Sequence, residues 1–474
     1  MLNTQPQLNE FENKMRNCQI SECVIEAFRQ YYTKLISNES DNIDEDKISP
    51  IRNLATLDDL DEKYKFIGNE ALDQLAILKL NGGMGSSMGL KGPKSLLKVK
   101  DGLTFLDIII GQISCLCKDT KTNVPLILLN SFLTQKTIQK ALKSYGELKQ
   151  NVPMLLLQNR MPKIWKHGLG PVNGLNDSQL EWYPPGHGDL ILALSSTGLL
   201  QSLLTQGIKY LFISNADNLG ATYDAKIFGY IISQNAPFLM EVVHRTLADI
   251  KGGHLAQKRS DGHLIIRTEA QCPTNDLKKF QDISRYPYFN TNNLWLHLPT
   301  LQTYLKEKPT ELRLPMIVNE KPVNPSQPTS HKVYQLESSI GSAVSLFPGA
   351  QALCVSRRRF IPVKSTNDLL LIWSDLYFLD KDYYLRSTLE DTGGKISEGP
   401  LIRLDQRYFQ MIDGFHIRFP YGAPSLAHCT GLSIEGDIRF GNKVVLEGNV
   451  QLVNSKSQPL VIPDNSVIHK DTYQ

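Results

Sequence analysis

A glycine-rich loop after a short apolar run holds the residues best suited to chemistry. Residues 75–98 read LAILKLNGGMGSSMGLKGPKSLLK, and the apolar start predicts a buried strand. Five glycines follow, with Lys91 and Lys94 on either side of Pro93. Glycines let backbone N–H groups approach an anion, and lysines add positive charge. The combination is typical of a loop that cradles phosphate.

Two well-known phosphate-binding motifs do not match this loop. A Walker A motif needs Gly, Lys and Ser or Thr in direct succession, whereas Pro93 separates Gly92 from Lys94. A dinucleotide fingerprint beginning at Gly83 would need a glycine where Met88 stands. The alternatives are another kind of phosphate cradle and a surface loop rich in glycine. The preceding strand and the lysines favour phosphate.

A carboxylate stands where another predicted strand ends. The run YLFIS at 210–214 is followed by Asn215, Ala216 and Asp217. Mg²⁺ prefers one or two carboxylates together with phosphate oxygens and water. Asp217 is therefore a candidate Mg²⁺ ligand beside a phosphate loop, although taken alone it would more often cap a turn.

The segment WYPPGHGD, residues 182–189, contains a third candidate group. Gly186 and Gly188 leave the backbone around His187 bare, which suits main-chain recognition of a flat base or a phosphate. A buried structural histidine is the rival interpretation of His187. For Asp189 we expect a structural role, capping the helix that follows.

Composition limits the function classes. The 474 residues are 41% hydrophobic and 21% charged with a net charge of +3, which indicates two or three globular domains and gives no argument for nucleic acid or membrane surfaces. No signal-peptide pattern and no apolar run of about 18 residues occur, so we expect a cytoplasmic protein. The seven cysteines are scattered, with only Cys115 and Cys117 close together, and predict neither a zinc site nor a disulfide framework.

The elements that must position these residues follow from periodicity. An amphipathic helix is expected from Ile20 to Leu35 with Ser21 at its cap, followed by an acidic linker or exposed arm at 37–50. From 75 to about 378, apolar runs alternate with helical stretches, which argues for a mostly parallel sheet wrapped by helices. The runs are 125–130, 153–158, 210–214, 238–243 and 293–296, with helices at 134–145 and 189–205.

The C-terminal segment has a period of six residues. One register is Leu432, Ile438, Val444 and Val450, and the other is Ile434, Phe440, Leu446 and Leu452. Val461 and Val467 repeat the step after an interruption. Such hexapeptides predict a parallel β-helix, with a set of antiparallel hairpins as the alternative. We therefore expect an N-terminal helix and linker at 1–50, a catalytic domain at 51–382 and a β-helix domain at 383–474.

Several of these segments together resemble a known family. Their order and spacing are similar to those of the UTP-glucose-1-phosphate uridylyltransferases, also called UDP-glucose pyrophosphorylases, over almost the whole chain. The matching segments are LNGGMGSSMGLKGPKS, WYPPGHGD, SNADNLGAT, ADIKGGHL, FNTNNLWL and RFIPVKSTNDLLL. Asn81 and the pair Ser87-Met88 match the glucose branch rather than the UDP-N-acetylhexosamine enzymes. The resemblance implies a Rossmann-like nucleotidyltransferase fold of mixed, mostly parallel sheet, with a left-handed β-helix at the end.

The resemblance also implies roles for individual residues. Gln158 and Gly186 correspond to the family's uracil readers, and Lys94 and Lys364 to its two essential lysines. His187, Asn215 and Asn292 correspond to sugar-phosphate contacts with Asn290 close by, and Asp217 to the Mg²⁺ ligand. The full nucleotide-binding set comprises Leu80, Asn81, Gly82, Gly83, Lys94, Gln158, Gly186, Asn215, Asp217 and Lys364.

The implied reaction is a direct displacement. An oxygen of glucose 1-phosphate attacks the α-phosphorus of UTP in line, and Mg-pyrophosphate leaves without a covalent enzyme intermediate. Two alternatives stay open, namely a UDP-sugar pyrophosphorylase of broad specificity and a non-catalytic relative that binds UDP-glucose. The chain departs from animal members by ending at Gln474, about one β-helix rung earlier, and Ala216 is smaller than the residue usual there. We therefore expect a monomer or a small homo-oligomer rather than an octamer.

Overall fold

The structure is a computed structural model, and the description covers residues 5–39, 41–145, 154–308, 314–389, 391–392, 395–396 and 399–469. The chain forms two compact units. Unit 1 comprises Met1–Gly82, Asn123–Ser214 and Tyr223–Val355, and unit 2 comprises Gly83–Thr122, Asn215–Thr222 and Ser356–Gln474. The domain boundaries expected at residues 50 and 382 stay predictions.

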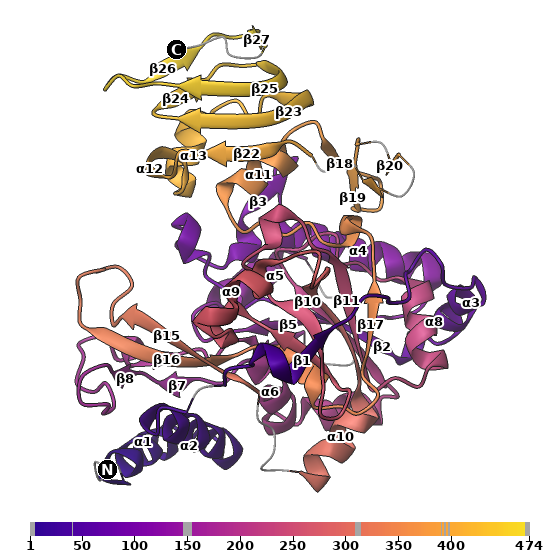
Figure 1. Cartoon of the computed structure of the whole chain (residues 1–474), viewed down its shortest axis with the longest axis vertical. Helices are drawn as coiled ribbons and strands as arrows, with labels where there is room; N and C mark the ends of the chain where they lie inside the picture. Colours follow the sequence, from indigo (N-terminus) through magenta and orange to yellow (C-terminus); the bar gives the residue numbers. More distant parts are fainter. Residues whose placement is uncertain are drawn as a thin grey trace. The chain divides into compact units, whose positions relative to one another are not determined.

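Unit 1 is built on one large mixed sheet (Figure 1). Its main path runs β1 (Ile48–Pro50), β12 (His254–Lys258), β14 (Tyr288–His297), β10 (Tyr210–Asn215), β2 (Leu75–Leu80), β5 (Leu126–Asn130), β6 (Leu155–Leu157). Off this path, β11 (Phe238–His244) pairs with β14 and with β17 (Gln351–Cys354), and β13 (Leu264–Arg267) pairs with β12. The six predicted strands correspond to β2, β5, β6, β10, β11 and the end of β14, and residue 153 of the run 153–158 lies outside the described residues.

The direction of the strands differs from the prediction. Parallel pairing joins β2 to β5, β5 to β6 and β11 to β17. However, β14 runs antiparallel to both β10 and β11, and β12 runs antiparallel to β1 and β13. The sheet is therefore mixed, and the expectation that it is mostly parallel was too strong. The buried apolar part of β14, residues 294–296, reads the same whichever way the strand points.

The main hydrophobic core of unit 1 lies between this sheet and its helices. It joins apolar side chains of β2, β5, β10, β11 and β14 to those of α6 (Leu190–Ser196), α7 (Leu199–Thr205) and α10 (Leu298–Glu307). The other helices of the unit are α1 (Gln5–Asn17), α2 (Glu22–Ile36), α3 (Lys63–Glu70), α5 (Gln135–Leu142), α8 (Ala225–Ser233) and α9 (Leu277–Gln281). The predicted helix at 134–145 is α5 and a 3-10 turn, and the one at 189–205 is broken at Gly198, whose φ is 75°.

The N-terminal helices form a second apolar cluster within unit 1. Helices α1 and α2 pack on short strands that include β7 (Met161–Pro162), β8 (Ile164–Trp165), β9 (Trp182–Tyr183) and β16 (Lys332–Ser338), and β15 (Met316–Pro322) pairs with β16. Helix α2 confirms the amphipathic helix expected from Ile20 to Leu35. Ser21 stands at its N-cap position, but its side chain makes no capping hydrogen bond.

The acidic segment 37–50 is not simply an exposed arm, as one reading of the sequence had it. Strand β1 pairs antiparallel with β12 at the edge of the sheet. The buried Glu45 carboxylate accepts hydrogen bonds from Arg267 (2.7 Å), Arg285 (2.6 Å) and the Tyr286 hydroxyl (2.9 Å). A glutamate within an acidic stretch is expected to be exposed. Burying its charge would cost free energy without the hydrogen bonds from residues far along the chain.

Unit 2 contains the phosphate-loop segment and the C-terminal strands. Its helices are α4 (Phe105–Thr120), α11 (Thr366–Trp373), α12 (Gln406–Phe409) and α13 (Ile412–Arg418). Three short antiparallel pairs accompany them: β3 (Lys98–Lys100) with β4 (Leu103–Thr104), β18 (Tyr377–Leu379) with β19 (Leu385–Ser387), and β20 (Asp391–Thr392) with β21 (Lys395–Ile396). Parallel pairing then joins β22 (Leu401–Leu404), β23 (Ser425–Glu435), β25 (Val445–Val453) and β27 (Val467–Ile468) in that order. A second parallel pair joins β24 (Ile438–Phe440) and β26 (Leu460–Ile462). Figure 1 shows β22, β23 and β25 stacked beside one another.

The six-residue pattern is confirmed in its first part and wrong in its continuation. All eight positions of the two registers from Leu432 to Leu452 are buried. Val461 and Val467, however, are 62% and 51% exposed, while Ile462 and Ile468 are fully buried. Phe440 pairs with Ile462, 22 residues further on, whereas three hexapeptides would span 18, so an insertion lies between β25 and β26. The inward positions after it are Ile462 and Ile468, one residue beyond the pair expected from the sequence, and a difference of one residue turns a strand side chain to the opposite face.

The structure also bears on the expectations about disulfide bonds and membrane-spanning segments. All seven cysteines are free. In the described part of the chain, every helix falls short of the length and apolar character needed to cross a membrane.

Candidate active site

Within unit 2, Lys94, Asp217 and Lys364 form one charged cluster. Lys94 Nζ lies 2.8 Å and Lys364 Nζ 3.3 Å from the same Asp217 oxygen, Oδ2. These residues come from the end of the glycine loop, the turn after β10 and the segment before α11. The backbone supports the arrangement, because Val363 N–H donates to the Asp217 carbonyl at 3.1 Å.

The Asp217 carboxylate is nearly buried and holds its charge. Its side chain is 13% exposed, that of Lys94 15% and that of Lys364 58%. Burial alone would raise the pKa of Asp217, but the charges of Lys364 and Lys94 outweigh it and hold the pKa below its usual value. Its second oxygen, Oδ1, is buried and has no hydrogen-bond partner among the described residues. Two cations and one spare carboxylate oxygen are therefore available to a polyanion and a metal ion.

The glycine loop preceding Lys94 is folded back on itself. Lys94 N–H donates to the Gly83 carbonyl at 3.1 Å, and Gly85 and Gly89 have φ values of 62° and 71°. Those two positions favour glycine for its backbone freedom. At Gly83, by contrast, a Cβ would meet nothing within 4 Å. The backbone there is accessible, as a phosphate cradle requires.

In unit 1, the predicted nucleotide-binding residues that follow β2 are hydrogen-bonded to the end of β5 and the residue after it. Asn81 is buried and donates to Asn130 Oδ1 at 2.7 Å, and the Gly82 carbonyl accepts from Ser131 Oγ at 2.9 Å. A Cβ on Gly82 would lie 2.8 Å from Gln158 Oε1, so this glycine leaves room for the glutamine amide. Leu80 is the last residue of β2.

The two predicted uracil readers touch each other. Gln158 is buried and its Nε2 donates to the Gly186 carbonyl at 2.7 Å. Gly186 has a φ of 80°, and a Cβ there would lie 2.5 Å from the Ser338 carbonyl oxygen. Both the backbone angle and the close approach require glycine at this position.

The predicted sugar-phosphate residues of unit 1 gather around Ile340 and Gly341. His187 Nδ1 accepts from Ile340 N–H at 3.1 Å, so the neutral ring carries its proton on Nε2. A Cβ on Gly341 would lie 2.6 Å from Asn290 Nδ2 and 3.6 Å from Asn292 Oδ1. Gly341 could not be identified from the sequence, because no local motif marks the backbone that these three side chains approach.

A bulge in β14 presents the two asparagines. Glu241 of β11 pairs with Asn293 and Val242 pairs with Asn290, so two residues of β14 loop out between them. Asn292 takes a φ of 61°, and its N–H donates to Asn290 Oδ1 at 2.8 Å. Backbone held in this sparsely populated region is typical of functional sites. Asn215 ends β10, and its carbonyl accepts from Asn218 N–H at 3.2 Å.

The expectation that Asp189 caps a helix is wrong. Asp189 stands at the N-cap position of α6 but makes no side-chain capping bond. Its carboxylate instead accepts hydrogen bonds from Asn159. The sequence places Asp189 just before a helix and gives no sign of a partner thirty residues away, so the commonest role was the wrong one.

Comparison with known proteins assigns the family. The family model described as UTP–glucose-1-phosphate uridylyltransferase matches residues 25–447. The chain belongs to this family.

Relatives of the uridylyltransferase family match most of the chain. A probable UTP–glucose-1-phosphate uridylyltransferase of Schizosaccharomyces pombe is 38% identical over 85% of this chain and 77% of its own length. The Saccharomyces cerevisiae enzyme of that name is 38% identical over 86% of this chain and 80% of its own.

Solved structures of UDP-glucose pyrophosphorylases match the fold. The Leishmania major enzyme, solved in open and closed forms, has a TM-score of 0.90 and 38% identity over 99% of each chain. The Trypanosoma brucei protein has a TM-score of 0.89 and 41% identity over 98% of this chain and 99% of its own. A Leishmania major variant solved in complex with UDP-glucose has a TM-score of 0.89 and 38% identity, covering 99% of both chains. The family resemblance noted in the sequence is confirmed.

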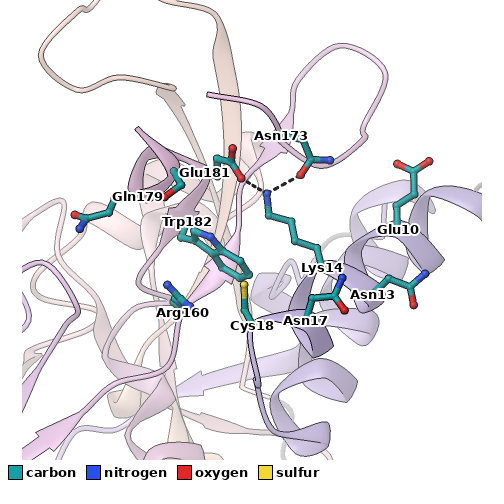
Figure 2. A pocket seen from close by; sticks show the side chains of 11 residues that line it. Glu10, Asn13, Lys14, Asn17, Cys18, Arg160, Asn173, Gln179, Glu181 and Trp182 are labelled. Atoms are coloured by element: carbon teal, nitrogen blue, oxygen red, sulfur yellow. Dashed lines mark hydrogen bonds and ion pairs between the residues drawn. The ribbon is translucent and has the colours of Figure 1, made fainter. Parts of the chain in front are cut away.

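This uridylyltransferase-family chain also has a cavity elsewhere in unit 1. Figure 2 shows it between α1 and the segment around Trp182, where Lys14 reaches Glu181 and Asn173. Its volume is about 630 Å³, and none of the predicted site residues lines it. In the described ranges, no group of three or more His, Cys, Asp or Glu side chains is arranged to hold a metal ion.

Proposed function

We propose that the chain transfers the uridylyl group of UTP to glucose 1-phosphate, giving UDP-glucose and pyrophosphate. Membership of the family and the UDP-glucose complex of a structural neighbour support this reaction. The observation that carries the proposal within this chain is the cluster in which Lys94 and Lys364 share one oxygen of Asp217.

We propose that Gln158 and Gly186 recognise uracil. The Gln158 amide is fixed by its bond to the Gly186 carbonyl, and Gly82 leaves space at its oxygen. A fixed amide and backbone groups can match the hydrogen-bond donors and acceptors on the edge of uracil. Cytosine has a different pattern and would leave some of these buried groups unpaired, which gives strong selectivity for uracil over cytosine. Leu80, Asn81 and Gly83 would hold the rest of the nucleoside by their backbone.

The sugar phosphate is assigned to His187, Asn215, Asn290 and Asn292. Asparagine side chains and a neutral imidazole with its proton on Nε2 offer donors to hydroxyl and phosphate oxygens. The bulge in β14 and the contact of Ile340 with His187 fix the unit 1 members of this set before a substrate arrives.

Asp217 fits the role of a Mg²⁺ ligand. Its buried Oδ1 has no hydrogen-bond partner among the described residues, and a carboxylate with room for phosphate oxygens is the ligand that Mg²⁺ prefers. When bound, Mg²⁺ would neutralise charge on the phosphates of UTP. Lys94 and Lys364 would then exchange their contact with Asp217 for contacts with phosphate oxygens.

No protein nucleophile is needed for the displacement. An anionic oxygen of glucose 1-phosphate forms a bond to the α-phosphorus of UTP, and the bond from that phosphorus to the bridging oxygen of the β-phosphate breaks as pyrophosphate leaves. The protein holds the two polyanions in line and supplies the positive charge of Lys94 and Lys364.

The test is pyrophosphate release from UTP with several sugar 1-phosphates, with and without Mg²⁺. We expect Mg²⁺-dependent release with glucose 1-phosphate, and a loss of about a hundredfold or more in kcat for Lys94→Ala and for Lys364→Ala. Lys98→Ala, an exposed lysine on β3, is the matched control and should keep full activity. A near-normal kcat in either Lys94→Ala or Lys364→Ala would contradict the assignment of these lysines to the active site.

The same panel separates the alternatives. Equal turnover of galactose 1-phosphate would favour a UDP-sugar pyrophosphorylase of broad specificity. Binding of UDP-glucose without pyrophosphate release would favour a non-catalytic relative.

We propose further that the C-terminal strands form a parallel, left-handed β-helix. The partners Leu432 and Val450, and Ile434 and Leu452, are each separated by three hexapeptides, which is the spacing of one coil with three sides. The buried registers support this interpretation. We also propose a cytoplasmic location, which the seven free cysteines suit.

A further inference from the structure

A buried carboxylate lies beside the proposed uracil readers and accepts three hydrogen bonds from one residue. Asp189 is 2% exposed. Its Oδ2 accepts from the backbone N–H of Asn159 at 2.7 Å, and both of its oxygens lie 3.0–3.1 Å from Asn159 Nδ2. When Asp189 is ionised, these are charge-assisted hydrogen bonds, which are stronger than bonds between neutral groups.

The two residues of this pair stand next to the two uracil readers. Asn159 directly follows Gln158, and Asp189 lies three residues after Gly186. The Gly186 carbonyl accepts from Gln158 Nε2 at 2.7 Å and from Asp189 N–H at 3.3 Å. The segment after β6 and the GHG turn are therefore joined twice, once through the readers and once through Asn159 and Asp189.

The Gln158–Gly186 bond alone leaves the readers free to separate when a base competes for the glutamine amide. On the other side, the Gln158 backbone is held by its N–H bond to the Asn130 carbonyl, at 2.8 Å. The Asn159–Asp189 pair ties this strand end to the turn through groups that the proposed function leaves free of the base. Such support around a binding group is what keeps a site pre-organised.

We propose that Asp189 is a positioning residue for nucleobase selection: by clamping Asn159, it holds Gln158 and Gly186 at the spacing that distinguishes UTP from CTP. The inference rests on the proposed function, which assigns those two residues to uracil. It assigns Asp189 no contact with substrate. A carboxylate kept in the interior for stability alone would be a poor choice, since burial disfavours its charge.

The test compares single variants with a variant that exchanges the two groups. Asp189→Ala removes both acceptor oxygens from Asn159, so the clamp opens. In Asn159→Asp/Asp189→Asn, the new amide donates to the new carboxylate and still accepts from the backbone N–H of residue 159, so the clamp re-forms. Asp224→Ala is the matched control, because Asp224 accepts two backbone N–H bonds at the cap of α8.

The readout is kcat/KM for UTP divided by kcat/KM for CTP, measured by pyrophosphate release. We expect Asp189→Ala to lower this ratio tenfold or more, chiefly through KM for UTP, with kcat at saturating UTP changed less than threefold. The exchanged variant should recover at least half of the lost selectivity on a logarithmic scale, and Asp224→Ala should keep the ratio of the wild type.

The outcomes separate this inference from the proposed function. A wild-type protein that releases no pyrophosphate would overturn the function itself. With an active wild type, an unchanged UTP/CTP ratio in Asp189→Ala would overturn the inference, even if its melting temperature falls. Where Asp189→Ala fails to fold, the exchanged variant decides, and a folded exchanged variant without selectivity would also overturn it.

Discussion

Two buried carboxylates show how the environment sets a charge at the scale of single residues. Two lysines outweigh the effect of burial at Asp217 and hold its pKa below the usual value. At Asp189, burial dominates and raises the pKa to about 7, although Asn159 opposes the rise. The first carboxylate is thus kept as an anion that can meet a metal ion, and the second depends on neutral donors alone.

The imidazole of His254 provides a prediction about pH. His254 is fully buried and stacks on Tyr286, with ring centroids 3.8 Å apart. Burial, with a smaller contribution from the charge of Arg245, lowers the pKa of His254 to about 3. The unfolded chain, with a pKa of about 6.5 for this group, therefore takes up the proton first as the pH falls.

Stability from neutral His254 is present above pH 6.5 and is lost as the pH falls toward 3. The free energy of unfolding of the wild type should drop relative to His254→Phe by about 1.4 kcal/mol per pH unit below about 6.5. Denaturant unfolding at pH 7.5, 6 and 5 measures this difference. The exposed His167→Phe is the control, and a difference for His254→Phe that does not grow as the pH falls would contradict the prediction.

Residue types were predictable where they sit in long motifs, and their partners were not. Lys94, Asp217 and Lys364 could each be named from the sequence. Nothing in the sequence shows that the two lysines, 123 and 147 residues away from Asp217 along the chain, contact the same oxygen of its carboxylate. Asp189 was assigned to a helix cap for the same reason, since its true partner is thirty residues away. Local rules describe local hydrogen bonds, and the site is made of distant ones.

At the scale of elements, the GHG turn and the bulge in β14 carry the proposed substrate contacts. Glycine before His187 was predictable as bare backbone, because that property belongs to the residue itself. The bulge was not, because FNTNNLWL reads as one strand and the two extra residues appear only against the register of β11. The direction of β14 was hidden for a related reason, as its apolar run reads the same both ways.

The GHG turn should not tolerate a side chain at Gly186. A Cβ there would lie 2.5 Å from the Ser338 carbonyl, and the φ of 80° adds strain for any L residue. Gly186→Ala should therefore shift the turn away from Gln158 and lower kcat/KM for UTP by about a hundredfold, as misplaced binding groups do.

Gly170→Ala is the matched control for this substitution. A Cβ on Gly170 meets nothing within 4 Å. Both variants should be compared by steady-state pyrophosphate release and by thermal unfolding. Wild-type kcat/KM in Gly186→Ala would show that the turn does not position the nucleotide.

At the scale of the whole molecule, each compact unit is assembled from three separate segments. Segments 83–122 and 215–222 belong with the C-terminal segment in unit 2, and no composition change in the sequence marks them out. The hexapeptide tail was predictable because its contacts are between neighbouring repeats, so its period is written directly into the chain. The pattern failed only after residue 453, where an insertion breaks that period.

The corrected register of the tail can be tested by its effect on stability. Leu446 is fully buried, and its truncation to alanine should cost about 2–5 kcal/mol in the free energy of unfolding. Val461→Ala, at a position expected from the sequence to repeat the inward step after an interruption, should change it by about 0.5 kcal/mol or less, because Val461 is 62% exposed. Ile462→Ala, one residue further on and fully buried, should behave like Leu446→Ala. Denaturant unfolding followed by circular dichroism measures all three, and a larger loss at Val461 than at Ile462 would show that Val461 is the residue that faces inward.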